Sequence, residues 1–280
     1  MKKFSLVLGG LGVFGLGTYI TTQVYKTSKE LEKVRSIQKE TGITHHHELS
    51  DDNCSCNYSV DKTRAIYNRI SKNYDEKVDF DEWLIGVTGL RKKLMLHVGG
   101  NVLEVAAGSG RNLTEYEKRK DNIEHLTLAD YSGGMLKQAK EKLGKDFSKP
   151  EIVSLIPKVD AHSLPFKDNE FDCTIDTFGL CSFEDPVKVL KEMNRVTKPG
   201  GKILLLEHGK SNKYQWLTNY LDAWSIERAK KWGCWWNRDI EKIVKESGLN
   251  VVKKEVYQLG TCYYYIAQKR VSSSSTTSNT

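Results

Sequence analysis

The segment Val102–Asn112 has the residue types of a ligand-binding turn. An apolar run of strand length leads into Gly108-Ser109-Gly110, and a helix can start directly afterwards. Glycines let the backbone come close to a ligand at the carboxyl end of a strand. Asp130 lies 20 residues past Gly110, at the end of the next apolar run, where a carboxylate can accept hydrogen bonds from both hydroxyls of a ribose. Together these features predict a nucleoside site.

Two departures from the dinucleotide pattern argue against a pyrophosphate ligand. The turn lacks the third glycine that brings a pyrophosphate onto the N-terminus of the following helix. Glu104 lies just upstream of the turn. A carboxylate there disfavours phosphates and favours a cationic ligand, directly or through water. We therefore expect a nucleoside that carries a positive charge.

Two further stretches carry a resemblance to a known family. Val159–Phe166, followed by Phe171-Asp172, resembles the adenine-recognition stretch of the S-adenosylmethionine-dependent methyltransferases, and Arg195–Gly201 is similar to the segment before their fifth strand. The resemblance covers roughly residues 60 to 270. The most similar group includes the ubiquinone/menaquinone C-methyltransferases, phospholipid N-methyltransferases, and membrane-anchored methyltransferase-like proteins of fungal mitochondria and the animal endoplasmic reticulum.

The resemblance implies S-adenosyl-L-methionine as the cofactor and methyl transfer as the reaction. It places the methionine end near Glu104 and the turn glycines, the ribose on Asp130, and the adenine between Tyr131 and Asp160 with their neighbours. The cofactor-binding residues that it implies are Glu104, Ala106, Gly108, Gly110, Asn112, Asp130, Tyr131, Met135, Asp160, Ala161, Thr177 and Phe178.

Ala106 departs from the family pattern, because many relatives have the first glycine of the turn at this position. A methyl group is tolerated there if φ is negative. The cofactor assignment is therefore retained. The alternative is a nucleotide-fold domain that binds no cofactor.

The segment after the fourth predicted strand bears on the methyl acceptor. No Asn/Asp-Pro-Pro-Tyr sequence follows that strand, and Thr177–Phe183 stands in its place. Planar nitrogens of bases or glutamine amides are therefore not expected as acceptors. Family analogy favours a small hydrophobic or amphipathic molecule, such as a quinone precursor, a phospholipid head group or a thiol. The alternative is a membrane-bound assembly or scaffold protein that keeps the fold with little or no catalysis.

His208 and several aromatic residues follow the fifth predicted strand. His208 can take a proton near neutral pH and is the candidate catalytic base; alternatively it only hydrogen-bonds the backbone of the next loop. Trp216, Tyr220 and Trp224 are spaced four residues apart and share a helix face. That face is either a packed helix surface or a lipid-like substrate wall or membrane-contacting lid. The predicted acceptor-side residues are Leu180, Trp216, Tyr220 and Trp224.

The elements that must position these residues alternate along the chain. Apolar runs of strand length are separated by helical patterns, which predicts an open, doubly wound α/β sheet. With the resemblance, we expect a Rossmann-like sheet of seven strands, mostly parallel, with an antiparallel last strand. The third predicted strand, 151–160, contains Pro157. Because proline cannot donate to a strand ladder, this strand should lie at a sheet edge.

An uncharged run of 22 residues, Phe4–Tyr25, precedes the domain. Its length is sufficient to cross a bilayer as a helix. We expect a retained transmembrane anchor; a cleaved secretory signal and a mitochondrial presequence are the alternatives. The predicted division is 1–26 anchor, 27–60 polar linker, 61–270 methyltransferase domain and 271–280 disordered tail.

The flanks of the anchor and the composition bear on location and partners. A basic start with no acidic residue before Glu30 favours a single-pass protein of the mitochondrial inner membrane, with the endoplasmic reticulum membrane as the alternative. The net charge of +7 fits a membrane surface or a nucleic acid, but the basic residues form no stripe. The expected partners are therefore a membrane and a small-molecule or lipid-like acceptor, and no nucleic acid.

The spacing of the cysteines and histidines bears on whether the chain binds a metal. The six cysteines show no zinc-knuckle spacing and no disulfide framework, so reduced thiols and no metal are expected. His45-His46-His47 and the nearby Cys54 and Cys56 can be a metal site or part of a solvated tether, and the tether is favoured because their spacing fits no common ligand pattern.

Overall fold

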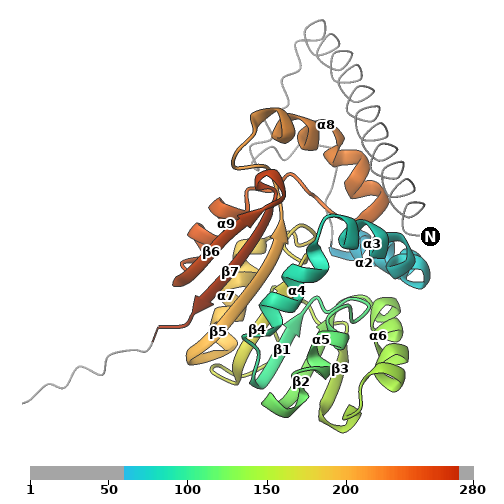
Figure 1. Cartoon of the computed structure of the whole chain (residues 1–280), viewed down its shortest axis with the longest axis vertical. Coiled ribbons are helices and arrows are strands. Elements are labelled where there is room, and N and C mark those ends of the chain that lie inside the picture. Colours follow the sequence, from blue (N-terminus) through green and yellow to red (C-terminus); the bar gives the residue numbers. More distant parts are fainter. Residues whose placement is uncertain (1–59, 271–280) are drawn as a thin grey trace, which may run out of the picture. The chain divides into compact units, whose positions relative to one another are not determined.

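A seven-stranded sheet is the frame of the protein in a computed structural model that describes residues 60–270 (Figure 1). The strand order is β3-β2-β1-β4-β5-β7-β6. Neighbouring strands from β3 to β5 are parallel, and β7 is antiparallel to both β5 and β6. The predicted Rossmann-like sheet with an antiparallel last strand is thus confirmed. The strands are β1 (Gly100–Val105), β2 (Ile123–Asp130), β3 (Val153–Pro157), β4 (Phe171–Thr177), β5 (Thr197–His208), β6 (Val251–Tyr257) and β7 (Cys262–Gln268).

Helices cover both faces of this sheet. Side chains alternate across each strand, so Val102 packs into one buried cluster with α4, α5 and α6, while Leu103 packs into another with α7 and α9. The α-helices are α2 (Val60–Ile70), α3 (Tyr74–Leu84), α4 (Val87–Met95), α5 (Leu113–Glu117), α6 (Gly133–Asp146), α7 (Pro186–Val196), α8 (Gln215–Trp232) and α9 (Ile240–Ser247).

Local sequence signals set several helix starts. The hydroxyl of Ser132 accepts a hydrogen bond from the backbone N–H of Met135 at the start of α6, and Asp185 accepts one from Lys188 at the start of α7. These caps satisfy N–H groups that have no partner within the helix. Asp239 caps α9 in the same way, because its side chain accepts a hydrogen bond from the backbone N–H of Lys242.

Two strand boundaries show where tertiary pairing matters. β3 lies at the sheet edge and ends at Pro157, as the missing N–H of proline requires. β5 begins at Thr197, although Pro199-Gly200-Gly201 predicted a break that ended before Lys202. The backbone N–H of Gly200 bonds to the carbonyl of Lys269, and the N–H of Lys269 bonds to the carbonyl of Gly201. Pairing with a distant segment therefore overrides the local turn signal.

The predicted anchor Phe4–Tyr25, the linker and the tail lie outside the described residues. Within residues 60–270, none of the helices combines the length and the apolar character that a membrane span requires.

Candidate active site

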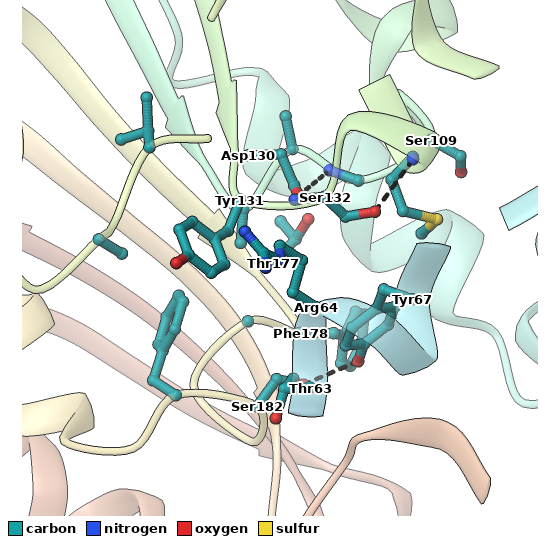
Figure 2. A pocket seen from close by; sticks show the side chains of 18 of the residues that line it. Thr63, Arg64, Tyr67, Ser109, Asp130, Tyr131, Ser132, Thr177, Phe178 and Ser182 are labelled. Atoms are coloured by element: carbon teal, nitrogen blue, oxygen red, sulfur yellow. Dashed lines mark hydrogen bonds between the residues drawn. The ribbon is translucent and has the colours of Figure 1, made fainter. Parts of the chain in front are cut away.

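A cavity of about 910 Å³, including its open mouth, lies at the carboxyl ends of β1, β2 and β4 and is bordered by α2 (Figure 2). Ligands of open α/β sheets bind at this edge. Of the residues implied for the cofactor, those on the cavity wall are Ala106, Gly108, Asp130, Tyr131, Met135, Asp160, Ala161, Thr177 and Phe178. Glu104, Gly110 and Asn112 lie behind the wall, since they are not among its lining residues.

Asp130 is held rigidly at the end of β2. Its Oδ2 accepts a hydrogen bond from the backbone N–H of Gly108 at 2.8 Å, and its Oδ1 accepts one from Ser132 at 2.7 Å. Burial raises the pKa of this carboxyl to about 6 despite both bonds. Each carboxylate oxygen has a further lone pair, so the side chain can still accept two hydroxyls from a ligand in the cavity.

Glu104 supports the turn from behind. Its carboxylate is 1% exposed and accepts hydrogen bonds from Asn112 Nδ2 at 2.7 Å and from the Tyr116 hydroxyl at 2.8 Å. Burial raises the pKa of Glu104 to about 7. Glu104 and Asn112 thus brace each other, and any effect of this charge on a ligand acts through the turn or through water.

Both glycines of the turn have a positive φ, +58° at Gly108 and +74° at Gly110, and packing adds a second requirement at Gly110. Gly108 has φ +58°, and a Cβ there would meet Met135 at 3.5 Å, an ordinary contact, so its backbone conformation is what favours glycine. At Gly110 a Cβ would lie 2.7 Å from Leu113 Cδ1 and 3.1 Å from Ala139 Cβ. Gly110 therefore allows the turn to pack against α6.

Ala106 and Phe178 adopt backbone conformations that non-glycine residues rarely take. Their φ angles are 51° and 61°. The condition of a negative φ at Ala106 is therefore wrong: the backbone there needs the left-handed region, and the methyl group is strained by about 1–2 kcal/mol. Both residues follow the ends of adjacent parallel strands, β1 and β4, and both line the cavity. Strain of this kind concentrates at functional sites.

The residues that the resemblance assigns to the adenine also line the cavity. Tyr131 lies on the wall with Arg64 Cζ 4.9 Å from its ring centroid. Asp160 accepts hydrogen bonds on Oδ1 from the backbone N–H of His162 at 2.9 Å and from its Nδ1 at 2.7 Å. The backbone N–H of Val159 bonds to the carbonyl of Asp130, which ties this segment to the ribose-side carboxylate.

The sequence analysis missed the wall made by the first three helices of the domain. Thr63, Arg64 and Tyr67 of α2, Tyr74 of α3 and Arg91 of α4 line the cavity. The Tyr67 hydroxyl lies 2.7 Å from Ser182 Oγ (Figure 2). The only sequence signal was Tyr67 and Tyr74 seven residues apart, and this spacing also suits an ordinary packed helix face.

Arg91 connects this wall to the strand ends. Its guanidinium pairs with Glu82 at 2.9 Å and donates hydrogen bonds to Asn112 Oδ1 at 3.0 Å and Thr177 Oγ1 at 2.9 Å. Its Cζ lies 5.0 Å from the ring centroid of Phe178. Nothing in the sequence separates Arg91 from the lysines beside it, because its role comes from burial against a distant strand.

α3 also holds the turn after β1. Arg111 pairs with Asp75 at 3.1 Å, Asp79 at 2.7 Å and Glu82 at 2.8 Å, and Ser109 Oγ donates to Asp75 at 2.6 Å. The turn is therefore fixed from outside by a carboxylate-rich helix, which shields it from anionic ligands.

The predicted acceptor-side residues lie away from the cavity wall. Leu180 is fully buried, and its N–H bonds to Glu207 Oε2. Trp216 is 54% exposed, and none of Trp216, Tyr220 and Trp224 lines the cavity. The buried face of α8 is instead made of Thr218, Leu221, Ser225 and Ala229.

His208 points toward two cysteines. Its Nε2 lies 3.1 Å from Cys234 Sγ, and its ring centroid lies 5.4 Å from that of Phe178. Phe178 lines the cavity, whereas His208 is not among the lining residues. His208 thus lies one side chain behind the wall.

The cavity fits a cationic nucleoside. Asp130 presents a fixed acceptor for ribose hydroxyls beside the glycine turn. Apolar surface from Met135, Ala161 and Phe178 can pack a base and an aliphatic chain. The residues present therefore suit S-adenosylmethionine.

The chain is similar in sequence to known methyltransferases. The chain is 30% identical over 260 residues to the mitochondrial methyltransferase OMS1 of Saccharomyces cerevisiae, covering 86% of this chain and 54% of that protein. It is 32% identical over 156 residues to the ubiquinone/menaquinone biosynthesis C-methyltransferase UbiE of an Enterobacter species, covering 54% of this chain and 61% of that protein. The chain thus spans just over half the length of these relatives.

Solved structures and a family model complete the comparison. An O-methyltransferase family protein from Burkholderia thailandensis superposes with a TM-score of 0.58 at 16% identity, over 77% of this chain and 64% of that one, which shows the shared fold. Residues 56–233 match the model of the ubiE/COQ5 methyltransferase family. The predicted enzyme class and cofactor are confirmed at the level of the family. The glycine turn, the ribose-side carboxylate and the sheet order all agree with this match, and the chain belongs to the ubiE/COQ5 methyltransferase family.

Proposed function

We propose that this protein transfers the methyl group of S-adenosylmethionine to a small acceptor that is hydrophobic or membrane-associated. The observation that carries the proposal is Asp130, whose two oxygens are each fixed by a backbone N–H while their outer lone pairs remain available on the cavity wall. This arrangement suits the two hydroxyls of a ribose, which can both donate to the same carboxylate.

The chain's own residues align the reactants. Asp130 holds the ribose, and the turn at Gly108 brings backbone close to the methionine end. The bound cofactor supplies an electrophilic methyl group on a sulfonium. Burial holds the pKa of Tyr67 above its ordinary value. The phenol therefore stays protonated, and with Ser182 it can orient an acceptor by hydrogen bonding rather than remove its proton.

The lining of the cavity supports an apolar, partly planar acceptor. Phe178, Phe183 and Tyr67 contribute aromatic surface, and Thr177 and Ser182 contribute hydroxyls. Aromatic walls with a few hydroxyls suit a ring that carries one or two oxygens. The Enterobacter relative is named for ubiquinone and menaquinone biosynthesis, which agrees with an acceptor of this chemistry.

A methyl-transfer assay tests the proposal. Full-length protein is incubated with S-adenosylmethionine labelled in the methyl group and with total membrane-lipid and small-molecule extracts. We expect label in an organic-soluble product, and none with Asp130→Ala. Tight binding of S-adenosylhomocysteine without transfer to any fraction would refute the acceptor class. Absence of cofactor binding would refute the enzyme and favour the scaffold alternative.

We also propose that Phe4–Tyr25 anchors the protein in a mitochondrial membrane. The length of the uncharged run is sufficient for a membrane-spanning helix. The yeast relative is named as a mitochondrial methyltransferase. Full-length protein should stay in the membrane pellet after alkaline carbonate extraction, whereas a chain that starts at Thr27 should be released. Mature protein that begins after Tyr25 in cells would show instead that the run is a removed targeting peptide.

A further inference from the structure

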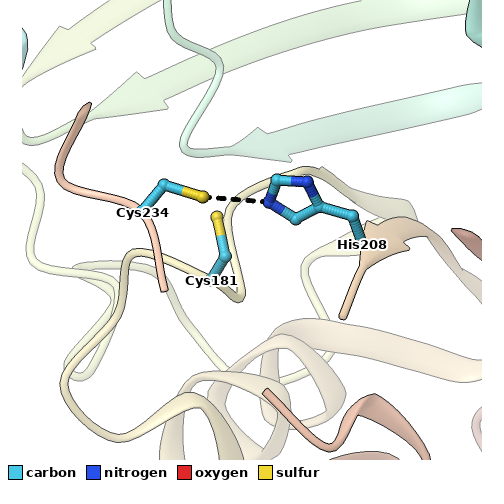
Figure 3. A group of neighbouring side chains, drawn as sticks. All are labelled: Cys181, His208 and Cys234. Atoms are coloured by element: carbon cyan, nitrogen blue, oxygen red, sulfur yellow. Dashed lines mark hydrogen bonds between the residues drawn. The ribbon is translucent and has the colours of Figure 1, made fainter. Parts of the chain in front are cut away.

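The metal-binding atoms of three side chains, Cys181, His208 and Cys234, come together at one point (Figure 3). Cys181 lies in the loop between β4 and α7, His208 is the last residue of β5, and Cys234 follows the end of α8. Their two sulfur atoms and the nearest imidazole nitrogen lie within 4.8 Å of one another, and His208 Nε2 is 3.1 Å from Cys234 Sγ.

This geometry is close to that of a bound zinc ion. With Zn–S near 2.3 Å and Zn–N near 2.0 Å, tetrahedral ligands are separated by about 3.8 Å between two sulfurs and about 3.5 Å between sulfur and nitrogen. A rearrangement of a few tenths of an ångström from the 3.1 Å contact would admit the ion. We propose that Cys181, His208 and Cys234 bind one Zn²⁺, with the fourth position taken by a water molecule.

The surroundings of the cluster suit thiolate ligands. Cys181 and Cys234 are 1% and 4% exposed, so competition from solvent is small. Two thiolates and a neutral imidazole balance the charge of Zn²⁺, which allows the ion to be buried.

The position of the site gives the ion a structural purpose. It would tie the loop after β4, the end of β5 and the segment after α8 to a single point. Two cavity residues touch the cluster: the Phe178 ring packs on His208, and Ser182 Oγ lies 3.4 Å from Cys181 Sγ. The ion would therefore fix the wall that faces the methyl acceptor, and this role does not depend on which acceptor is methylated.

Metal analysis of the purified full-length chain tests the proposal. Zinc content is measured by elemental mass spectrometry after dialysis, and affinity by competition with a chromophoric chelator. We expect one zinc per chain in the wild type and none in Cys181→Ala/Cys234→Ala. His208→Ala should weaken zinc binding at least about tenfold, since even residues that only support a ligand have effects of this size.

Two matched variants separate this site from other cysteines. Cys54→Ala/Cys56→Ala removes the sequence-adjacent pair near His45-His46-His47, and Cys173→Ala removes a buried thiol of β4. Both should keep the zinc. Zinc lost from the Cys54/Cys56 variant and retained without Cys181 and Cys234 would overturn the proposal and assign the ion to the N-terminal segment.

A measurement on the wild type keeps the test independent of folding defects. Replacement of zinc by Co²⁺ should give the intense visible bands of a tetrahedral ion and a sulfur-to-metal charge-transfer band. Protein purified without reductant is analysed by mass spectrometry for a Cys181–Cys234 disulfide. A wild type that takes up no Zn²⁺ or Co²⁺ with both thiols reduced, or one in which these thiols are found as a disulfide, contradicts the metal site.

Discussion

The cofactor side of the cavity is built from neighbours in sequence, whereas the opposite side is built from distant segments. Gly108, Asp130 and Ser132 lie within 25 residues and are joined by two hydrogen bonds from backbone N–H groups to the Asp130 carboxylate. Across the cavity, Tyr67 of α2 meets Ser182, more than a hundred residues away. A consecutive β-turn-α-β segment can hold one ligand by itself, while the other wall exists only after the whole domain has folded.

This difference implies that the two sides can be perturbed separately. A change at a strand end on the cofactor side should affect the nucleoside and leave the fold intact. A change on the other side should affect the acceptor, or the packing of the helices that form the wall, and should leave nucleoside affinity nearly unchanged.

Replacement of Asp130 by Ala should give the largest effect. The variant loses an acceptor for two ribose hydroxyls, each bond contributing up to about 1.5–3 kcal/mol. We expect binding of S-adenosylhomocysteine, measured by calorimetric titration, to weaken at least about tenfold. Asp172→Ala is the matched control, because that carboxylate lies at the opposite end of β4 and pairs with Lys198. If Asp130→Ala bound S-adenosylhomocysteine with unchanged affinity, Asp130 would not be the residue that binds the ribose.

The pH dependence of cofactor affinity should be the next largest effect. Burial raises the pKa of Asp130 to about 6, so the free site is protonated below that pH. Ribose hydroxyls favour the carboxylate, and binding therefore requires loss of a proton at low pH. Affinity should fall about fivefold between pH 6 and pH 5 and level off above pH 7.

The same shift has a consequence for stability. The pKa of Asp130 is near 4 in the unfolded chain and about 6 in the folded protein. The folded protein therefore binds more protons in this range, and the free protein becomes less stable as the pH rises from about 4 to about 6. S-adenosylhomocysteine should offset this loss. Binding of S-adenosylhomocysteine and the free energy of unfolding are measured at pH 5 and pH 7, with Asp130→Asn as the control. An equal pH dependence in that variant would attribute the effect to another group, such as Glu104.

Trp216→Ala/Trp224→Ala should affect the acceptor side alone. These residues lie off the buried face of α8, so the thermal midpoint should change little and S-adenosylhomocysteine affinity should stay within about threefold, under 1 kcal/mol. Methyl transfer to the acceptor or binding to liposomes should fall about fivefold or more, because tryptophan suits a boundary between apolar and wet surroundings. Loss of cofactor binding together with acceptor binding, or an unfolded variant, would make the stripe part of the core.

Ala106→Gly should give the smallest effect, and in the stabilising direction. At φ 51° the methyl group is strained, and glycine relieves this strain while gaining freedom in the unfolded chain. We expect the free energy of unfolding to rise by up to about 1 kcal/mol, measured by urea denaturation. A loss of stability would show that contacts of the methyl group outweigh its backbone strain.

Much of the cofactor side was determined by the sequence alone. The Gly-x-Gly turn, Asp130 at its fixed distance, the Ser132 cap and the edge position of Pro157 depend on backbone conformation and short-range hydrogen bonds. Such features repeat at the same spacing wherever this strand-turn-helix unit forms, and the strand and helix alternation then limits the sheet to few arrangements.

The tertiary structure decided what depends on contacts between distant segments. The left-handed backbone at Ala106, the buried network around Arg91 and the meeting of Cys181, His208 and Cys234 have no local signal. The orientation of α8 belongs here as well, since its buried face consists of small and aliphatic side chains while Trp216 remains exposed. The physical reason is that burial and side-chain pairing depend on which distant segment packs against each helix or strand. The spacing of residues within one segment does not show which segment that is.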